Sequence, residues 1–248
     1  MTNAGAGLQT DPAGWETLEL FADAPAFNQW LLNRILPYCK GHVLEAGSGI
    51  GNISGLLLDK HLKVSLSDLR SEYCLRLNKR FAAYPDLEGI YQMDLSLPDF
   101  ENRYPDLLGR FDTVVALNVV EHIKQDAVAI QNAKRLLRNN GTLIVLVPAG
   151  ECLYNNFDRE LGHYKRYSRK TLGRLLRAEK LTITCMSYFN FAGILGWWFS
   201  GSVMRKRTIP GSQLKLYNQL VPLFRFLDQL VAHAAGLSVI AVTTKQTT

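Results

Sequence analysis

The stretch Val43 to Asn52 (VLEAGSGIGN) constrains the fold of this chain more than any other. It begins as a short apolar run typical of a buried strand, turns through a glycine-rich loop and continues into a helically spaced apolar segment, 53–58. Strand, glycine turn and helix N-terminus together present backbone N–H groups to a ligand. Gly47 and Gly49 permit the tight turn and a close approach of the ligand to the main chain.

The spacing of the glycines separates two classes of ligand. The dinucleotide pattern G-x-G-x-x-G would require glycine at position 52, where this chain has Asn52. The chain has instead an acidic residue followed by alternating glycines, namely Glu45, Gly47, Gly49 and Gly51. This pattern resembles the first motif of class I S-adenosylmethionine-dependent methyltransferases. In that family the loop passes under the methionine part of the cofactor, and the acidic residue helps to hold it.

Two later strand ends support the same interpretation. The alternating run 63–67 ends at Asp68, close to the roughly 20-residue offset at which a carboxylate meets a ribose in doubly wound folds. The run 89–93 ends at Asp94, and the resemblance implies that this carboxylate receives the adenine amino group while Leu95 packs on the ring. Either aspartate alone would be a solvated strand end or a helix cap. Their register with the glycine loop favours a cofactor site.

The resemblance therefore implies that S-adenosyl-L-methionine is the cofactor. The residues expected to bind it follow the first, second, third and fourth strands: Glu45, Ala46, Gly47, Ser48, Gly49, Gly51, Asn52, Asp68, Leu69, Asp94, Leu95, Asn118 and Val119.

Composition indicates a globular chain of ordinary polarity. Of the 248 residues, 47% are hydrophobic and 20% charged, enough for one α/β domain with a large core. The net charge of +6 permits contact with nucleic acid or an anionic membrane without requiring it. Four widely spaced cysteines read as reduced thiols, which favours the cytoplasm. The polar start of the chain does not read as a signal peptide, and no apolar run reaches membrane-spanning length.

The alternation of strand and helix segments predicts a doubly wound, Rossmann-like α/β fold. The resemblance implies the methyltransferase-type sheet of seven strands, mostly parallel, with the last strand antiparallel. Strands are expected at 43–46, 63–67, 89–93, 111–117, 142–147, 181–189 and 237–243, and helices at 15–20, 25–39, 126–138 and 169–180. The 126–138 helix is expected to exit at Asn139-Asn140-Gly141. We expect a single domain, 1–248, with a helical cap (1–40), a core (41–193 and 236–248) and a lid insertion (194–235).

The segment after the fourth strand is the first candidate for chemistry. Asn118, Glu121 and His122 resemble the E-x-x-E-H segment of ubiquinone-biosynthesis O-methyltransferases, in which acidic and histidine side chains can hold a divalent metal. Asn118 stands where that pattern has its first acid, so one anionic ligand is missing and no metal site is expected. His122 remains a candidate catalytic residue.

The segment after the fifth strand, 156–168, is dense in polar and aromatic groups. Its Gly162-His163-Tyr164 sequence resembles a segment common among small-molecule methyltransferases. His163 is the first choice for a general base, because the unperturbed pKa of histidine lies near neutrality, and Tyr164 is a second candidate. The alternative, at equal weight, is that His163, Arg166 and Tyr167 tie the loop to Asp158 or Glu160.

The insertion 194–235 has an aromatic start, a basic triplet at 205–207 and one predicted amphipathic helix, 213–232, with a kink at Pro222. A lid over the edge that carries His163, enclosing an apolar acceptor pocket, is the favoured interpretation. A homodimer face and peripheral membrane contact through Trp197 and Trp198 are alternatives.

These observations favour methyl transfer to the oxygen or nitrogen of a small, hydrophobic or aromatic metabolite. The alternatives are an RNA methyltransferase, an enzyme acting on a lipid-linked acceptor at a membrane surface, and a cofactor-binding scaffold without catalysis. A nucleic-acid partner is not favoured, since the chain lacks the N/D-P-P-Y/F motif of many amino-methylating nucleic-acid enzymes; Asn118-Val119-Val120 stands there instead.

Overall fold

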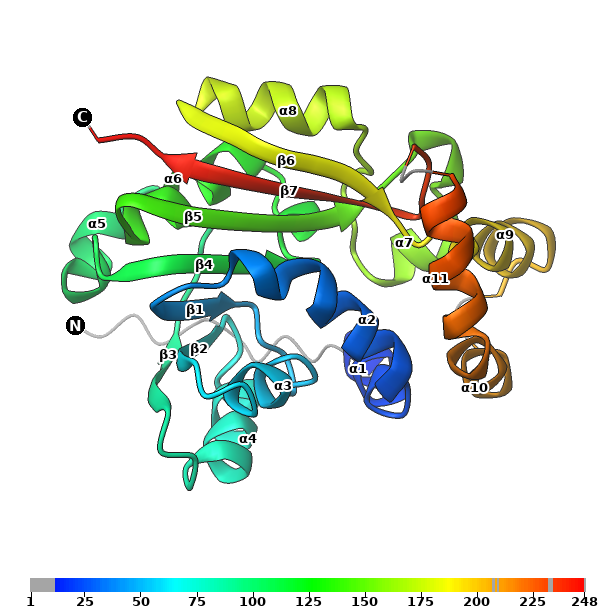
Figure 1. Ribbon diagram of the computed structural model, residues 1–248, viewed down its shortest axis with the longest axis horizontal. Helices are drawn as coiled ribbons and strands as arrows, with labels where there is room; N and C mark the ends of the chain where they lie inside the picture. The colour runs from blue at the N-terminus through cyan, green and yellow to red at the C-terminus, as the bar shows by residue number, and fades with distance from the viewer. Residues whose placement is uncertain (1–11, 207, 209, 232–233, 248) are drawn as a thin grey trace, which may run out of the picture.

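A seven-stranded sheet forms the centre of the computed structural model, which describes residues 12–206, 208, 210–231 and 234–247 (Figure 1). The order across the sheet is β3-β2-β1-β4-β5-β7-β6; β7 is antiparallel to both its neighbours and the other pairs are parallel. The predicted doubly wound sheet with a reversed last strand is confirmed. The strands are β1 (His42–Ala46), β2 (Lys63–Asp68), β3 (Leu87–Gln92), β4 (Phe111–Leu117), β5 (Leu137–Pro148), β6 (Leu181–Phe189) and β7 (Ser238–Lys245).

Helices cover both faces of the sheet. The α-helices are α1 (Pro12–Ala22), α2 (Pro25–Ile35), α3 (Ser54–Leu58), α4 (Ser71–Phe81), α5 (Phe100–Arg103), α6 (Asp126–Leu136), α7 (Asn156–Glu160), α8 (Arg169–Ala178), α9 (Gly193–Trp198), α10 (Gly211–Gln219) and α11 (Val221–Leu230). Short 3-10 turns are η1 (Leu36–Tyr38), η2 (Pro105–Leu107), η3 (Val120–His122) and η4 (Glu151–Leu153), and η5 (Phe199–Val203) is a π-helix.

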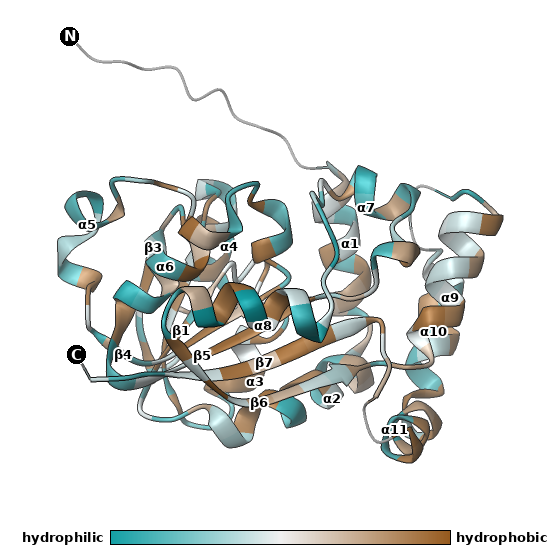
Figure 2. Ribbon diagram, turned by 90° about the horizontal axis from the view of Figure 1, so that it is seen from above, coloured by the Kyte–Doolittle hydropathy of each residue, from teal (hydrophilic) through white to brown (hydrophobic). Residues whose placement is uncertain are grey.

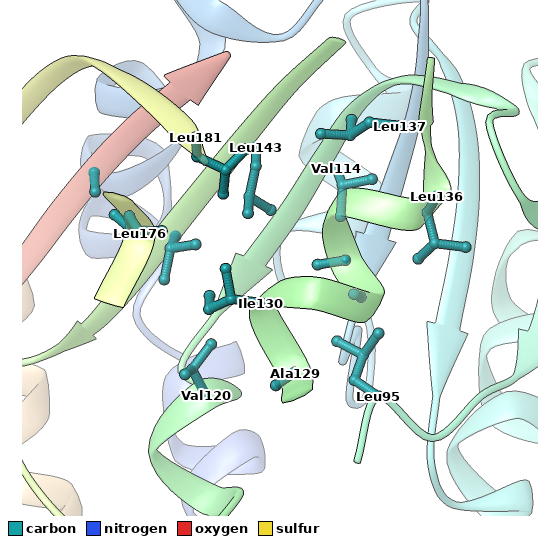
Figure 3. Packing of buried hydrophobic residues seen from close by; sticks show 14 of the residues in the cluster. Leu95, Val114, Val120, Ala129, Ile130, Leu136, Leu137, Leu143, Leu176 and Leu181 are labelled. Carbon is teal, nitrogen blue, oxygen red and sulfur yellow. The ribbon is translucent and has the colours of Figure 1, made fainter. Parts of the chain in front are cut away.

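Alternating strand residues divide the core into two layers. Leu143 and Val145 face α6 and α8, whereas Ile144 and Leu146 face α2 and α3. Figure 3 shows part of the first layer, where Ile130 of α6 lies among side chains from the sheet. Strands buried on both faces read as continuous apolar runs, and that is why the sequence located them well.

One predicted boundary is wrong. Asn139-Asn140-Gly141 was expected to end a helix that ran to Arg138, but α6 ends at Leu136 and β5 begins at the next residue. Leu137 pairs with Phe111 of β4, and the register then shifts before Thr142 pairs with Thr113. Asn140, with a φ of 61°, lies within this irregularity. Pairing with β4 therefore overrides the local helix-exit signal.

The N-terminal helix is longer than expected. The sequence predicted a helix over 15–20 after a loosely packed start, whereas α1 runs from Pro12 to Ala22. Trp15 of α1 stacks on Tyr73 of α4, with ring centroids 5.8 Å apart, and Arg76 lies over the Trp15 ring. These contacts fix α1 over the first βα unit; residues 1–11 lie outside the described part.

The insertion is also divided differently from the prediction. The single kinked helix expected over 213–232 is two helices, α10 and α11, which meet at Leu220. Pro222 lies in the first turn of α11, where its missing N–H breaks no helical hydrogen bond. Among the residues that the structure describes, no helix combines the length and the apolar character needed to cross a bilayer.

Candidate active site

The glycine loop follows β1 and is enclosed by two apolar side chains. Gly47 and Gly49 have φ values of 74° and 54°, a conformation that side chains other than glycine rarely adopt. A Cβ on Gly47 would overlap Val119, and one on Gly49 would lie 2.9 Å from Leu18 of α1. Glycine at both positions therefore permits the tight turn and its packing against Val119 and Leu18, as expected for the loop of the cofactor motif.

Asp68 positions this loop from the end of β2. Its buried carboxylate accepts hydrogen bonds from the N–H groups of Gly49 (2.9 Å) and Arg70 (3.0 Å). Burial raises the pKa of Asp68, and the two N–H donors oppose that rise. Ser48 N–H also donates to the carbonyl of Ser67 at 2.8 Å. Asp68, the residue expected to bind the ribose, therefore also stabilises the glycine loop.

Two residues of the motif support the loop from inside the core. Burial raises the pKa of Glu45 to about 7, and its carboxylate accepts a hydrogen bond from Ser54 of α3. Gly51, with a φ of 88°, lies where a Cβ would overlap Phe81 of α4. Glu45 thus joins β1 to α3, and Gly51 permits close packing against α4. Their predicted contacts with the cofactor stay predictions.

The other expected cofactor residues lie around the same strand ends. Asp94 accepts hydrogen bonds from the N–H (2.7 Å) and hydroxyl (2.6 Å) of Ser96, so its carboxylate also caps a turn. Leu95 is buried in the core and Leu69 is exposed. The Asn52 amide donates to the Leu18 carbonyl at 2.8 Å, which ties the loop to α1.

The turn after β4 carries the next group of expected residues. Asn118 has a φ of 53°, which asparagine tolerates better than most side chains. Its N–H donates to the Leu146 carbonyl at 2.9 Å. The chain then turns so that Val119 packs on Gly47 and Glu121 points into the core. The turn therefore connects the cofactor loop directly to the candidate catalytic residues.

A buried ion cluster, Asp158, His163 and Arg166, organises the segment after β5. The fully buried Asp158 carboxylate accepts from His163 Nδ1 (2.8 Å), Arg166 Nε (2.9 Å) and the Asn155 N–H (3.0 Å). These donors lower the pKa of Asp158 despite its burial. Arg166 also donates to the Ala149 carbonyl at 2.9 Å. His163 and Arg166 thus contact Asp158 as the structural interpretation expected, whereas Tyr167 donates its hydroxyl hydrogen to Asp126 at 3.0 Å instead of to Asp158 or Glu160.

The same geometry sets the tautomer of His163. Because Asp158 is ionised, Nδ1 of His163 carries the hydrogen that the carboxylate accepts. Nε2 of the neutral ring then has a free lone pair for a proton. The ring of the exposed His122 lies 4.7 Å from the ring of His163. A structural tie and a proton acceptor are therefore compatible roles for His163.

Glu121 is buried, which the sequence did not indicate. Within the part of the chain that the structure describes, neither carboxylate oxygen has a hydrogen-bond partner, and the side chain is fully buried. Burial raises its pKa to about 8, so at neutral pH the carboxyl group is mostly protonated. The Tyr164 N–H donates to the Glu121 carbonyl at 2.8 Å, which joins the turns after β4 and β5. No sequence pattern indicated that this side chain turns inward.

The absence of a metal site stays a prediction. Glu121, His122 and His163 bring one potential ligand atom each within 4.8 Å of one another. Asn118 leaves the segment after β4 with one ligand fewer, and a ring nitrogen of His163, from the segment after β5, is the third potential ligand here.

Glu121→Gln is expected to stabilise the protein at about pH 8 and to change little at about pH 5. The folded-state pKa of about 8 lies above the ordinary value of 4.5, so the native state keeps a proton that the unfolded chain releases. Stability therefore declines as pH rises between these values. Glutamine removes this part of the decline, a gain on the order of 4 kcal/mol at pH 8. Urea unfolding across this pH range measures it; identical slopes for the parent and the variant would contradict it. Glu160→Gln, at an exposed site, is the control.

The insertion packs against the ion cluster. Trp197 of α9 lies 4.6 Å from the Arg166 guanidinium and 5.0 Å from the Phe157 ring, and its carbonyl accepts from the Asn155 amide at 3.3 Å. These contacts place α9 at the edge of the sheet that carries His163, as expected. A hollow of about 320 Å³ lies at the opposite edge, between the ends of α6, α8 and β7, and it is too far from these residues to be the expected acceptor pocket.

A family model described as a methyltransferase domain matches residues 44–143. The chain is 28% identical over 133 residues to polyketide synthase 42 of Dictyostelium discoideum, a match that covers 45% of this chain and 5% of that protein. The chain thus spans a small part of the length of this relative.

Solved structures share the fold across most of the chain. Phosphoethanolamine N-methyltransferase 2 of Haemonchus contortus, in complex with S-adenosyl-L-methionine, matches with a TM-score of 0.61 and 15% identity over 96% of this chain and 59% of its own. 1,6-Didemethyltoxoflavin-N1-methyltransferase of Burkholderia thailandensis, with its acceptor and S-adenosylhomocysteine bound, matches with a TM-score of 0.55 and 17% identity over 93% and 80%. Residues 44–143, from β1 into β5, therefore match a methyltransferase domain, and the sheet order is that of the Rossmann-like methyltransferase fold.

Proposed function

We propose that this chain transfers the methyl group of S-adenosylmethionine to the oxygen or nitrogen of a small, largely apolar metabolite. The observation that carries the proposal is the Asp158–His163 pair, which contacts connect to the cofactor loop. Gly47 packs under Val119, and Glu121 follows in the same turn. The Tyr164 N–H then donates a hydrogen bond to the Glu121 carbonyl. A prepared proton acceptor therefore lies at the strand ends where doubly wound sheets bind ligands.

The loop residues fit the cofactor. Gly47 and Gly49 give the loop its tight turn, and Asp68 offers a carboxylate at the distance along the chain expected for a ribose. When bound, S-adenosylmethionine supplies a methyl group already attached to a good leaving group. The protein must then hold the nucleophile in line, exclude water and remove its proton.

His163 is proposed as the residue that removes the proton. Asp158 fixes its ring orientation and stabilises the positive charge that the ring acquires. Arg166 balances the charge of Asp158, and the neutral Glu121 adds no competing anion at pH 7. Tyr164 is exposed beside the pair and is proposed to orient the acceptor, with His122.

Two observations support a small, apolar acceptor: the side chains at this edge of the sheet, and the names of similar proteins. Trp197 of α9 packs against Arg166 at this edge, and this apolar side chain supports an apolar metabolite as the acceptor. Relatives and neighbours named for polyketide synthesis, phosphoethanolamine and a toxoflavin precursor all concern small molecules. The free state of all four cysteines supports the cytoplasm as the proposed compartment.

His163→Ala is expected to lower turnover by about 100-fold or more, the usual contribution of a general base, while cofactor affinity changes only a few-fold. Calorimetry with S-adenosylmethionine gives the affinity, and mass spectrometry of a metabolite extract incubated with methyl-labelled cofactor gives product formation. The control is His61→Ala, because the His61 side chain is 86% exposed and distant from the loop. Equal turnover in the two variants would remove His163 from catalysis.

The same assay tests the expected absence of a metal. We expect activity to survive a chelator, because Asn118 supplies no anionic ligand. Loss of activity with EDTA and its recovery with magnesium would instead make Glu121, His122 and His163 a metal site.

A further inference from the structure

Helix α11 has two apolar faces, which is unusual for a surface helix. Its inner face carries Val221 and Phe224, which pack towards α2 and Tyr217 of α10. The opposite side carries Leu223, Phe226 and Leu230, at spacings of three and four residues, and these side chains are 52%, 55% and 65% exposed. The inner face is sufficient to hold the helix in place, so the outer face requires another explanation.

A second exposed apolar stripe runs along α9 and η5. Leu195, Trp198, Phe199 and Val203 recur at helical spacing and are all exposed, whereas Trp197 and Ser200 turn inward. Figures 1 and 2 place α9, α10 and α11 together at one end of the molecule, beyond the end of β6. We call the seven exposed residues of the two stripes the apolar face: Leu195, Trp198, Phe199, Val203, Leu223, Phe226 and Leu230.

The segment that carries the apolar face has charges of nearly one sign. The sequence from 193 to 235 contains five cations and one acid. That acid, Asp228, is buried and accepts hydrogen bonds from the N–H groups of Asn190 and Phe191. Among the described residues of the segment, Arg205, Lys215 and Arg225 are exposed. The solvent-facing charge of the described segment is therefore positive.

We infer that the apolar face docks on an anionic phospholipid surface. Exposed leucine, phenylalanine and tryptophan side chains enter the boundary between head groups and acyl chains, and surrounding cations are attracted to anionic lipid. A second copy of the chain would bring the same cations together and is disfavoured by their repulsion. No helix of the described residues could span the bilayer, so the contact is peripheral.

Docking would also orient the proposed active site. Trp197, on the inner side of α9, packs on Arg166 of the ion cluster, so the edge that carries His163 lies directly behind the apolar face. An acceptor that partitions into the bilayer would then reach the site without crossing water. This consequence depends on the proposed function, whereas the docking itself does not.

The test is cosedimentation of the full chain with vesicles of phosphatidylcholine alone and of phosphatidylcholine mixed with phosphatidylglycerol. We expect binding to the mixed vesicles that weakens as salt is raised. Leu223→Glu combined with Phe226→Glu should weaken it at least tenfold. The matched control is Leu75→Glu, which changes a leucine of α4 that is 70% exposed away from the insertion.

A second pair of variants tests the charge. Lys215→Glu combined with Arg225→Glu should weaken binding by more than tenfold. The control is Lys60→Glu combined with Lys170→Glu, an equal change in net charge at exposed positions outside the insertion, and it should have a much smaller effect. Near-ultraviolet circular dichroism and cofactor affinity confirm that each variant is folded.

Three outcomes would overturn the inference: no binding of the parent chain to mixed vesicles, equal weakening by the control variants, or a stable dimer that Leu223→Glu with Phe226→Glu separates while vesicles bind nothing. The last would assign the face to a second copy. Vesicle binding needs no methyl transfer, so a failure here and a failure of the proposed function are distinguishable.

Discussion

Asp158→Asn is expected to destabilise the fold by about 3–5 kcal/mol and to lower turnover by at least about 100-fold. Asp158 is fully buried and is the ion-pair partner of the equally buried Arg166. Without its negative charge, the guanidinium remains buried and uncompensated, which is the costly way to break a buried pair. The asparagine amide also no longer fixes the Nδ1 hydrogen of His163.

Urea unfolding measures the stability change, and the labelled-cofactor assay measures turnover. Asp23→Asn, which changes an exposed aspartate between α1 and α2, is the matched control. A second variant, Arg166→Met, removes the buried cation while keeping much of the side-chain volume. If loss of charge balance dominates, Asp158→Asn combined with Arg166→Met should be more stable than Asp158→Asn alone. A stability loss below about 1 kcal/mol for Asp158→Asn would contradict this account.

Asp68→Ala is expected to weaken S-adenosylmethionine binding by roughly 10- to 100-fold, which corresponds to 1.5–3 kcal/mol for a lost charge-assisted hydrogen bond. Two causes act together. The variant removes the carboxylate expected to accept from the ribose, and it leaves the Gly49 N–H without its acceptor in the loop. Isothermal titration calorimetry measures the change.

The control is Asp59→Ala, which removes an exposed carboxylate beyond the end of α3. Asp68→Asn separates the two causes, because an amide oxygen can still accept from Gly49 but carries no charge. We expect its affinity to lie between those of the parent and the alanine variant. Unchanged affinity for Asp68→Ala would remove this residue from the site, and preferential binding of NAD would contradict the expected cofactor.

The sequence by itself determined the sheet and the cofactor loop. Fully buried parallel strands are continuous apolar runs, and the tight turn after β1 needs glycine at Gly47 and Gly49, so both features are recorded locally in the chain. In both cases, neighbours along the chain decide the structure. The reversed last strand, in contrast, was expected from the resemblance to the methyltransferase sheet.

Only the tertiary structure decided the remaining features, because they depend on partners far apart in the sequence. Asn140 lies within β5 because Leu137 before it and Thr142 after it pair with β4. Glu121 is buried by residues that are distant in the sequence, and its raised pKa follows from that burial. His163 meets Glu121 and His122 because parallel strands end at one edge, and this edge brings together side chains that no spacing along the chain could have paired.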